Sequence, residues 1–487
     1  MLTYNLLLII SILPLINIFL IIFISNIKFC KLITLIITNL VFIFSFLIWI
    51  LFNSKTSLFQ FCLTLFWSHK FNLSYSIGID GISIFFILLT SFLILVCIIT
   101  SWSSIKFLLK EYLICFLILE FCLIQVFCVL DLLLFYIFFE SILIPMFLII
   151  GLWGSRERKI RAAYQFFLYT LIGSFLMLIA LVFIYLEIGT FDIQILSHYF
   201  FNKEIQIWLW LALFIGFAVK IPMFPFHLWL PEAHAEAPTA GSIILAGILL
   251  KIGGYGFLRF SLPMFPEASV YFSPLIFTLS IIAVIYGSLT TLRQIDLKKI
   301  IAYSSISHMG FVTIGIFSFN IQGIEGSILL MLSHGIISSA LFFCIGILYD
   351  RYKTRLIKYY SGLVQFMPLF IIFFSFFSFS NTGFPGTSSF VAELLILFGS
   401  SNFSLLVTFF LSFGIIFSAS YSIWLLNRIS FNNINFFYIK KYQDISRREF
   451  LLLFLLLLFT LLFGIFPYLL LDEIHFSVLN LLLQINN

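Results

Sequence analysis

Runs of about 20 apolar residues recur along the whole chain, separated by short polar segments. An α-helix needs a run of about this length to cross roughly 30 Å of hydrocarbon. Hydrophobic residues fill 62% of the 487 positions and charged residues only 9%. A water-soluble domain could not cover so much apolar surface. The sequence therefore predicts an all-α membrane protein that crosses the bilayer many times.

Fourteen ranges fit such a span, with charged and turn-forming residues between them. The range 363–400 is long enough to be one interrupted helix. The predicted spans are about 2–24, 32–52, 82–102, 111–130, 132–153, 163–187, 206–225, 238–262, 271–292, 299–319, 325–349, 363–400, 403–427 and 449–471.

Lysine and arginine are distributed unevenly between the connecting segments. We assign 24 cations to the connecting segments, counting Arg259 and Lys299 at the ends of their spans with the adjacent loops; twenty follow odd-numbered spans and four follow even-numbered spans. The positive-inside rule places the cation-rich loops on the matrix or cytoplasmic side, so both chain ends should face the opposite compartment. A miscounted span would scramble this asymmetry. The twenty include Lys298, Arg355, Lys440 and Lys441, and the four are Lys55, Lys70, Lys203 and Arg259.

The first residues predict a retained membrane helix rather than a transit peptide, because no charge precedes Lys28 and arginine is missing. Phenylalanine occurs 67 times, beside many isoleucine and asparagine residues. This bias suits an A+T-rich genome, and so apolar a chain would be hard to import after synthesis. We expect an organelle-encoded protein. A bacterium with an A+T-rich genome is the alternative.

Two predicted spans contain residues that interrupt helices. Pro222 and Pro225 follow Lys220 directly, and proline removes a backbone donor and clashes with the preceding turn. Gly383 and Pro385 lie in the same way shortly before Glu393. Non-helical backbone at membrane depth occurs only where protein or a water-filled cavity satisfies it, and it often marks an ion pathway. Coincidental kinks in packed helices are the alternative.

The interruptions fall in spans 7 and 12, which are the fourth members of two five-helix units. An odd number of helices per unit would invert the second unit relative to the first, as in many transporters. We therefore expect four parts: spans 1–3 in residues 1–110, a first repeat in 111–262, an inverted second repeat in 271–427, and a loop with the last span in 428–487.

Four ionisable residues lie inside apolar runs: Glu140, Lys220, Lys251 and Glu393. Each costs about 2.5–3.5 kcal/mol at the bilayer centre, so together they cost about 10 kcal/mol and mark a functional pathway. A Glu–Lys pair that can separate would switch the proton affinity of the amine. A static ion pair that fixes helix packing is the alternative.

Histidines lie near these charges, and imidazole both takes and gives protons near neutral pH. His308 and His334 fall among serine and glycine in adjacent spans, which favours a proton relay over two helix-contact histidines. His227 and His234 occur with Glu232 and Glu236, but their irregular, proline-flanked spacing favours a polar lining at the interrupted helix over a metal site.

Other polar residues carry weaker signals. Glu120 lies in the middle of a span, and a functional and a structural role fit it equally well. Asp80 fits a turn or a helix cap, and Asp131 lies at a helix junction. The seven cysteines show no ligand spacing, and no nucleotide-binding motif occurs. We expect no cofactor or metal in this chain and no binding to nucleic acid.

Four stretches resemble one family closely: "GIDGISIFFILLT", "FYIFFESILIPMFLIIGLWGSRERKIRAAYQFFLYTLIGS", "FAVKIPMFPFHLWLPEAHAEAPTAGSIILAGILLKIGGYGFLRF" and "LRQIDLKKIIAYSSISHMGF". The chain is similar to the antiporter-like subunits of the membrane arm of mitochondrial NADH:ubiquinone oxidoreductase (respiratory complex I), in their subunit 4 group. The likeness covers most of residues 78–350 and weakens to about 427. The first 75 residues and the tail after about 430 match poorly.

The resemblance implies a fourteen-helix, proton-translocating translocase subunit with two inverted repeats in the mitochondrial inner membrane. The resemblance implies that Glu140 pairs with Lys220. It also implies that Lys251 relays protons with the histidines of spans 10 and 11, which are His308 and His334. Glu393 would lie near the proton exit. Electron transfer, with NADH, FMN, iron–sulfur clusters and ubiquinone, would belong to other subunits. Expected partners are neighbouring membrane-arm subunits and lipids. A cation/proton antiporter subunit and a passive scaffold are the alternatives.

Overall fold

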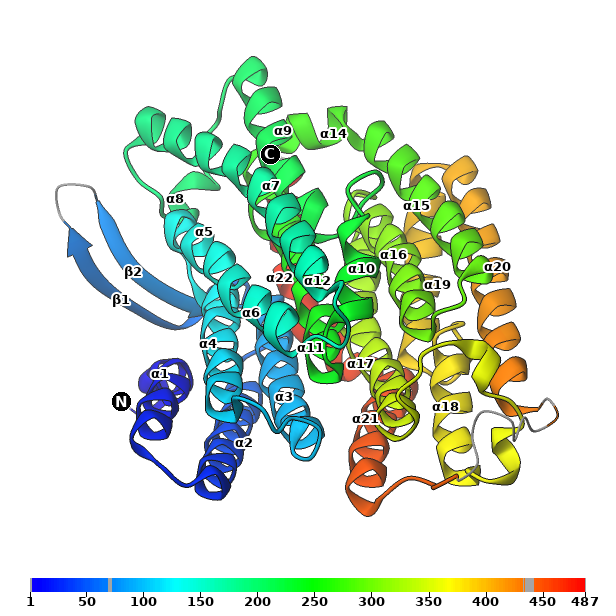
Figure 1. The fold of residues 1–487 in the computed structure, drawn as a ribbon. Coiled ribbons are helices and arrows are strands. Elements are labelled where there is room, and N and C mark those ends of the chain that lie inside the picture. Colours follow the sequence, from blue (N-terminus) through cyan, green and yellow to red (C-terminus); the bar gives the residue numbers. More distant parts are fainter. Residues whose placement is uncertain (1, 69–71, 432, 434–441, 487) are drawn as a thin grey trace.

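Long helices lie side by side in a single bundle (Figure 1). The computed structural model describes residues 2–68, 72–431, 433 and 442–486. Lys70, Lys440 and Lys441, which we used to orient the chain, lie outside the described residues. Among the described residues, twelve helices are long and apolar enough to cross a membrane. Helix also occupies most of each of the fourteen predicted ranges, and the number of crossings stays a prediction.

The first half of the bundle is built from helices that follow the predicted ranges, together with two short helices, α8 and α10, that lie outside every predicted range. They are α1 (Leu2–Phe23), α2 (Ile27–Leu51), α3 (Ser83–Ser101), α4 (Leu109–Cys128), α5 (Leu132–Ser141), α6 (Leu143–Trp153), α7 (Lys159–Ile188), the short α8 (Ile193–Leu196), α9 (Lys203–Lys220) and α10 (Trp229–Glu236).

The second half continues with α14 (Pro266–Tyr271), α15 (Ser273–Arg293), α16 (Leu297–Ile316), α17 (Ile321–Tyr352), the single turns η3 (Ile357–Tyr359) and η4 (Leu363–Gln365), α18 (Pro368–Ser380), α19 (Ser388–Phe403), α20 (Leu405–Ser430), α21 (Arg447–Ile465) and α22 (Tyr468–Asn486). Helix α17 is buried along almost its whole length and lies at the centre of the bundle.

Between these halves, one continuous helical segment runs from Thr239 to Met264 and is buried except at Arg259, which is partly exposed. It contains two π-helical turns, which occur often at functional sites. Its parts are α11 (Thr239–Ile244), η1 (Leu245–Leu249), α12 (Leu250–Gly256), η2 (Phe257–Ser261) and α13 (Leu262–Met264). Arg259 lies within η2, so our placement of this residue in a connecting loop is wrong.

Both predicted interruptions are confirmed. Helix α9 ends at Lys220, and no helix resumes until α10 begins at Trp229. Helices α18 and α19 are separated by a segment in which Gly383 has φ +74° and Gly386 has φ +92°, a conformation that side chains disfavour. The prolines and glycines of these segments are therefore where the chain leaves the helix.

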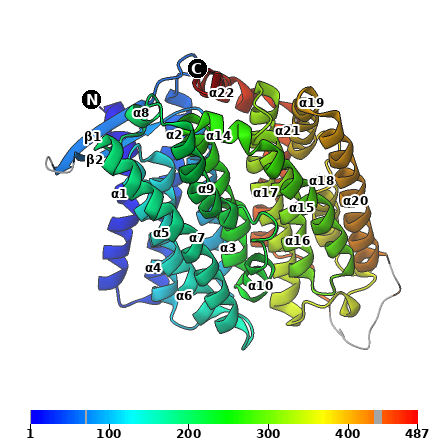
Figure 2. The same cartoon turned by 90° about the horizontal axis from the view of Figure 1, so that it is seen from above.

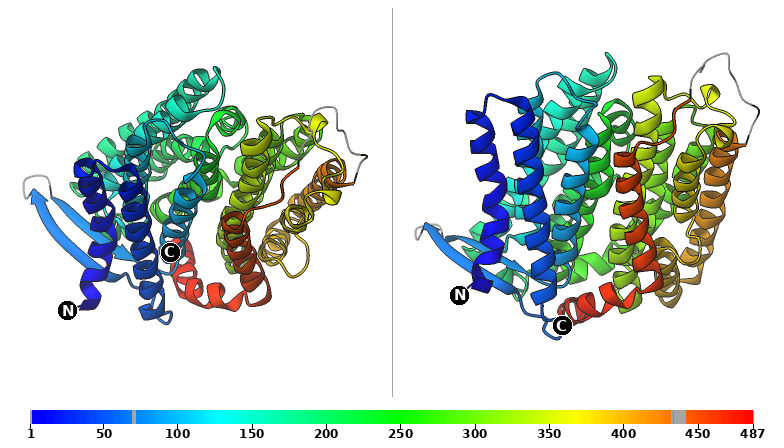
Figure 3. Two further views of the ribbon diagram at one scale, coloured as in Figure 1. Left: turned by 60° about the horizontal axis from the view of Figure 1, so that its bottom comes forward. Right: turned by 90° about the horizontal axis from the view of Figure 1, so that it is seen from below.

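Two features at one end of the bundle were not predicted. Strands β1 (Gln60–Ser68) and β2 (Leu73–Ile79) form an antiparallel hairpin in a chain expected to be all-α. Helix α22 follows α21 where we expected only a tail, and it lies across the ends of other helices (Figures 2 and 3). The Ser477 hydroxyl accepts a 3.0 Å hydrogen bond from the Gly81 amide and so ties α22 to the start of α3.

The two chain ends, the hairpin, α8 and α22 share one end of the bundle, which we call the α22 end (Figure 2). The loops richest in cations meet at the opposite end, which we call the cation-rich end. There Lys31 Nζ donates to Trp102 O at 2.5 Å, and Arg448 donates to Ser103 Oγ at 2.7 Å. This arrangement agrees with the uneven distribution of cations along the sequence.

Candidate functional site

Four buried ionisable side chains form a file through the bundle. They come from four different helices: Lys251 from α12, His334 from α17, His308 from α16 and Glu393 from α19. Each is at most 4% exposed. Since such groups are costly to bury, their convergence is the feature of the fold that most needs a functional explanation.

Lys251 begins the file beside a π-helical turn. Its Nζ donates to the carbonyl oxygen of Ala246, within η1, at 2.5 Å, and lies 2.8 Å from Nδ1 of His334. When the amine is charged it has only donors, so the facing imidazole nitrogen accepts. A proton moving from Lys251 to His334 would need no change of position by either side chain.

The two histidines continue the file toward α19. The ring centroids of His334 and His308 are 5.6 Å apart, and His308 Nδ1 lies 3.6 Å from Glu393 Oε1. The second distance is too long for a hydrogen bond but suits an ion pair or a bridging water. Neither ring nitrogen of His308 makes a hydrogen bond of good geometry with a described residue, although Asn381 lies beside the ring. The file therefore has polar gaps of the kind that water fills.

The interrupted segment between α18 and α19 makes room for the carboxyl group of Glu393. A Cβ atom added to Gly383 would collide with Glu393 Oε2, so this carboxylate lies directly against the backbone of the interruption. At Gly386, also in the left-handed region, an added Cβ would meet nothing within 4 Å. Substitutions at these two glycines therefore distinguish the cost of backbone strain, which both share, from displacement of the Glu393 carboxylate, which only Gly383 would cause.

We expect Gly383→Ala to impair proton translocation and Gly386→Ala to leave it near wild type. Both variants carry a backbone cost of about 1–2 kcal/mol, because alanine disfavours positive φ. Only the Gly383 variant displaces the Glu393 carboxylate. For both variants, thermal stability measures the backbone cost, and NADH-driven proton uptake into liposomes measures translocation. Equal losses of translocation in the two variants would contradict a specific role of this contact.

Glu140 and Lys220 lie near each other at the first interruption. Lys220 is the last residue of α9, where the helix dipole favours a cation, and it is 3% exposed. Its Nζ lies 4.5 Å from the centre of the Phe139 ring. The charges of Glu140 and Lys220 interact, but no direct ion pair joins them in the part of the chain that the structure describes. Glu140 Oε1 is buried without a partner there.

The end of α9 packs closely on the helix that carries Lys251. A Cβ atom added to Gly253 would come within 2.6 Å of Ile221, the residue after Lys220. Glycine thus allows the interruption to approach α12 two residues from Lys251. No hydrogen bond between described side chains joins Lys220 to Lys251. Any exchange of protons between these two lysines therefore needs bridging groups such as water.

His227, Glu232, His234 and Glu236 do not come together as a group. His234 is fully buried and stacks on Phe342 with ring centroids 4.6 Å apart. Glu232 pairs with Lys299 at 2.5 Å, whereas His227 packs against Phe224. Among the described residues, no set of three or more His, Cys, Asp or Glu side chains could hold a metal ion.

His234 instead lies between Lys251 and a buried ionic cluster at the cation-rich end. The charges of Lys251 and Lys298 both act on its ring. Lys298 Nζ donates to Ala237 O at 2.7 Å. Fully buried Arg355 lies 3.3 Å from Glu236 and 3.6 Å from Asp296.

We counted Lys298 and Arg355 among the orienting loop charges, which ordinarily face solvent, but both side chains are buried. Their positions next to helix ends gave no sign of burial in the sequence. The local sequence around an arginine outside the apolar runs does not distinguish an exposed side chain from a buried one.

The weaker sequence signals resolve differently. Glu120 is fully buried, and neither carboxyl oxygen has a partner among the described residues, so it stands apart from the file. Asp80 Oδ1 accepts from the Ser83 amide at 3.0 Å, as a helix cap does, and also pairs with Arg259 at 2.5 Å. Asp131 caps α5 through the amides of Leu133 and Leu134.

Comparisons with known proteins agree with this architecture. A family model described as NADH:quinone oxidoreductase/Mrp antiporter matches residues 129–418. NADH-ubiquinone oxidoreductase chain 4 of Chondrus crispus is 67% identical over 98% of both chains. The protein of that name from Arabidopsis thaliana is 57% identical over 94% of this chain and 92% of its own length.

Solved structures show the same fold. A chain of respiratory complex I from Thermus thermophilus, solved with bound NADH, has a TM-score of 0.89 at 27% identity and covers 98% of this chain and 99% of its own. A chain of the Mrp complex from Dietzia has a TM-score of 0.87 at 20% identity, covers 99% and 98%, and shows the fold alone. The chain therefore belongs to the NADH:quinone oxidoreductase/Mrp antiporter family, among the chain 4 subunits of NADH-ubiquinone oxidoreductase.

Proposed function

We propose that this chain translocates protons as an antiporter-like subunit in the membrane arm of NADH:ubiquinone oxidoreductase. Electron transfer from NADH to ubiquinone takes place in other subunits, which hold the FMN and iron–sulfur clusters, and this chain carries no redox centre. The observation that carries the proposal is the buried file from Lys251 through His334 and His308 to Glu393. A passive scaffold would have no use for four such groups.

The file supplies a sequence of proton acceptors. Lys251 gives its proton to His334 across 2.8 Å, and the proton passes through His308 to the carboxylate of Glu393. Lys220 and Glu140 control this step by charge: when Glu140 moves away from Lys220, the uncompensated cation favours loss of the proton from Lys251. His234, whose ring is near both Lys251 and Lys298, refills the file with protons from the cation-rich end.

Each transfer also works against the membrane potential, which costs about 2.3 kcal/mol per charge per 100 mV. The charge changes must therefore be driven from outside this chain. Neighbouring membrane-arm subunits are the partners that our proposal requires, and membrane lipids surround the rest of the bundle.

The proposed membrane arrangement follows from the two ends of the bundle. The cation-rich end faces the mitochondrial matrix, and the α22 end with both chain ends faces the intermembrane space, in the inner membrane. We propose fourteen crossings, with residues 111–262 and 271–427 as inverted repeats whose fourth helices are the two interrupted ones.

We expect His308→Asn to reduce NADH-driven proton translocation about tenfold, because asparagine fills similar space but cannot relay a proton. The matched control is His198→Asn, since His198 is exposed at the α22 end. The measurement is the ratio of protons translocated to electrons transferred by the complete complex in liposomes. An unchanged ratio in an assembled His308→Asn complex would rule out the relay.

A further inference from the structure

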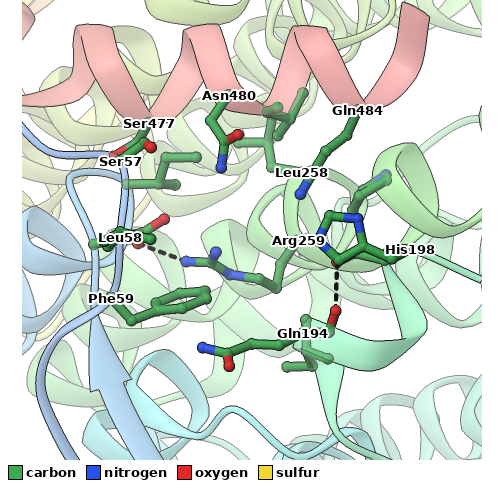
Figure 4. Close-up of a pocket in the computed structure, with 16 residues that line it drawn as sticks. Ser57, Leu58, Phe59, Gln194, His198, Leu258, Arg259, Ser477, Asn480 and Gln484 are labelled. Carbon is green, nitrogen blue, oxygen red and sulfur yellow. Dashed lines mark hydrogen bonds and ion pairs between the residues drawn. The ribbon is translucent and has the colours of Figure 1, made fainter. Parts of the chain in front are cut away.

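A cavity of about 380 Å³ opens at the α22 end, away from the file of ionisable groups (Figure 4). Its walls come from five segments that are far apart in the sequence: the segment before β1, the segment before α3, the short helix α8, the end of the helical segment Thr239–Met264 and one face of α22. Polar side chains that line it include Gln194, His198, Asn480 and Gln484. A cavity of this size and polarity holds several water molecules.

Arg259 forms the floor of this cavity. Its side chain is 11% exposed, and Nη2 donates to Asp80 Oδ1 at 2.5 Å. Its guanidinium also lies over the ring of Phe59, with 5.0 Å between the guanidinium carbon and the ring centre. Figure 4 shows this guanidinium between the hairpin side of the cavity and α22. The side chain is thus fixed from several directions.

The same residue also faces the interior of the bundle. Arg259 Nε donates to the hydroxyl of Tyr255 at 3.2 Å, and that hydroxyl donates to Phe127 O at 3.2 Å. Lys251, Tyr255 and Arg259 follow one another at intervals of four residues, so they share one face of the helix. Eight residues of helix separate Lys251 from the cavity floor by about 12 Å.

We propose that the guanidinium of Arg259, held by Asp80, is an electrostatic plug that keeps protons from passing between this cavity and Lys251. Arginine stays charged at every physiological pH, so it cannot serve as a relay. A fixed cation in a narrow, buried position repels hydronium, as arginines do in water channels that exclude protons. Tyr255 is the only other polar side chain on this face between the two sites.

The plug matters only if Lys251 carries protons, so this inference rests on the proposed function. A proton on Lys251 could otherwise reach the aqueous cavity along this face of the helix, past the Tyr255 hydroxyl, and bypass His334, His308 and Glu393. Such a bypass would dissipate the membrane potential. The Asp80–Arg259 pair would therefore insulate the file rather than take part in it.

The test measures passive proton flux into liposomes that contain the complete complex, with an imposed potassium diffusion potential and no NADH. Removing one partner of a buried pair leaves an unpaired charge, so the main variant replaces both: Asp80→Asn with Arg259→Gln. We expect this double variant to raise passive flux about tenfold. Asp80→Asn alone keeps the cation, which Tyr255 still holds, so the flux should stay near wild type in complexes that assemble. Lys203→Gln, at an exposed ion pair of the same end, is the matched control.

Adding Lys251→Met to the double variant should return the flux to the wild-type level, because the leak runs through Lys251. Equal fluxes in the double variant and wild type would overturn the plug. A leak that persists after Lys251→Met would also overturn it, since the flux would then follow a different route. NADH-driven pumping by Lys251→Met alone is a separate readout: intact pumping there contradicts the proposed function whatever the leak assay gives.

Discussion

Replacing Lys220 with methionine is expected to lower NADH-driven proton translocation at least about tenfold while the complex still assembles. Methionine fills nearly the same buried volume without a charge, so packing against Phe139 survives while the electrostatic link to Glu140 is lost. The measurement is proton uptake per electron in liposomes, with assembly checked by native electrophoresis.

Helix α9 provides its own matched control for this experiment. Lys203 begins the helix that Lys220 ends, and its side chain is 80% exposed, in an ion pair with Glu267. Exposed pairs contribute little, so Lys203→Met should change neither assembly nor pumping. Normal pumping by the Lys220→Met complex would remove this lysine from the mechanism.

Glu393→Gln is expected to have an equally large effect at the other end of the file. Glutamine keeps the shape of the side chain beside Gly383 but cannot accept and release a proton, so translocation should fall at least about tenfold. Glu393→Asp should retain more translocation than Glu393→Gln, because aspartate keeps a carboxyl group on a side chain that is one methylene shorter. Both are checked by proton uptake per electron in the reconstituted complex.

Glu267→Gln is the control, since Glu267 lies exposed at the α22 end and outside the file. If Glu393→Gln pumped as well as Glu267→Gln, the file could not end at this carboxylate. A loss of assembly in Glu393→Gln would show up in native electrophoresis. The Gly383→Ala variant, which keeps the carboxyl group, then tests the same position independently.

The sequence was sufficient to identify the ionisable groups that lie inside apolar runs. Lys220 and Lys251 stand out because a charge within an apolar run has few explanations other than function. The interruptions could also be located, because proline and glycine act on the backbone locally. The sequence in which Lys251, His334, His308 and Glu393 contact one another depends on how four helices pack. No local pattern encodes that packing.

Other parts of the structure have no local signal at all. Arg259 lies close enough to the end of the predicted span 238–262 to look like a loop residue. Only the position of Asp80, 179 residues earlier, shows that Arg259 is paired. The hairpin and α22 depend in the same way on contacts with distant segments, such as that between Gly81 and Ser477. Long-range pairing of this kind is decided by tertiary structure.

The most direct test of the whole account is a density map of the complete complex that resolves ordered water. The account predicts waters that bridge Lys220 to Lys251, which no hydrogen bond between described side chains joins, and waters that bridge His308 to Glu393, which lie 3.6 Å apart. Continuous aliphatic packing in these gaps, with no ordered water beside the buried charges, would contradict a proton pathway through this chain.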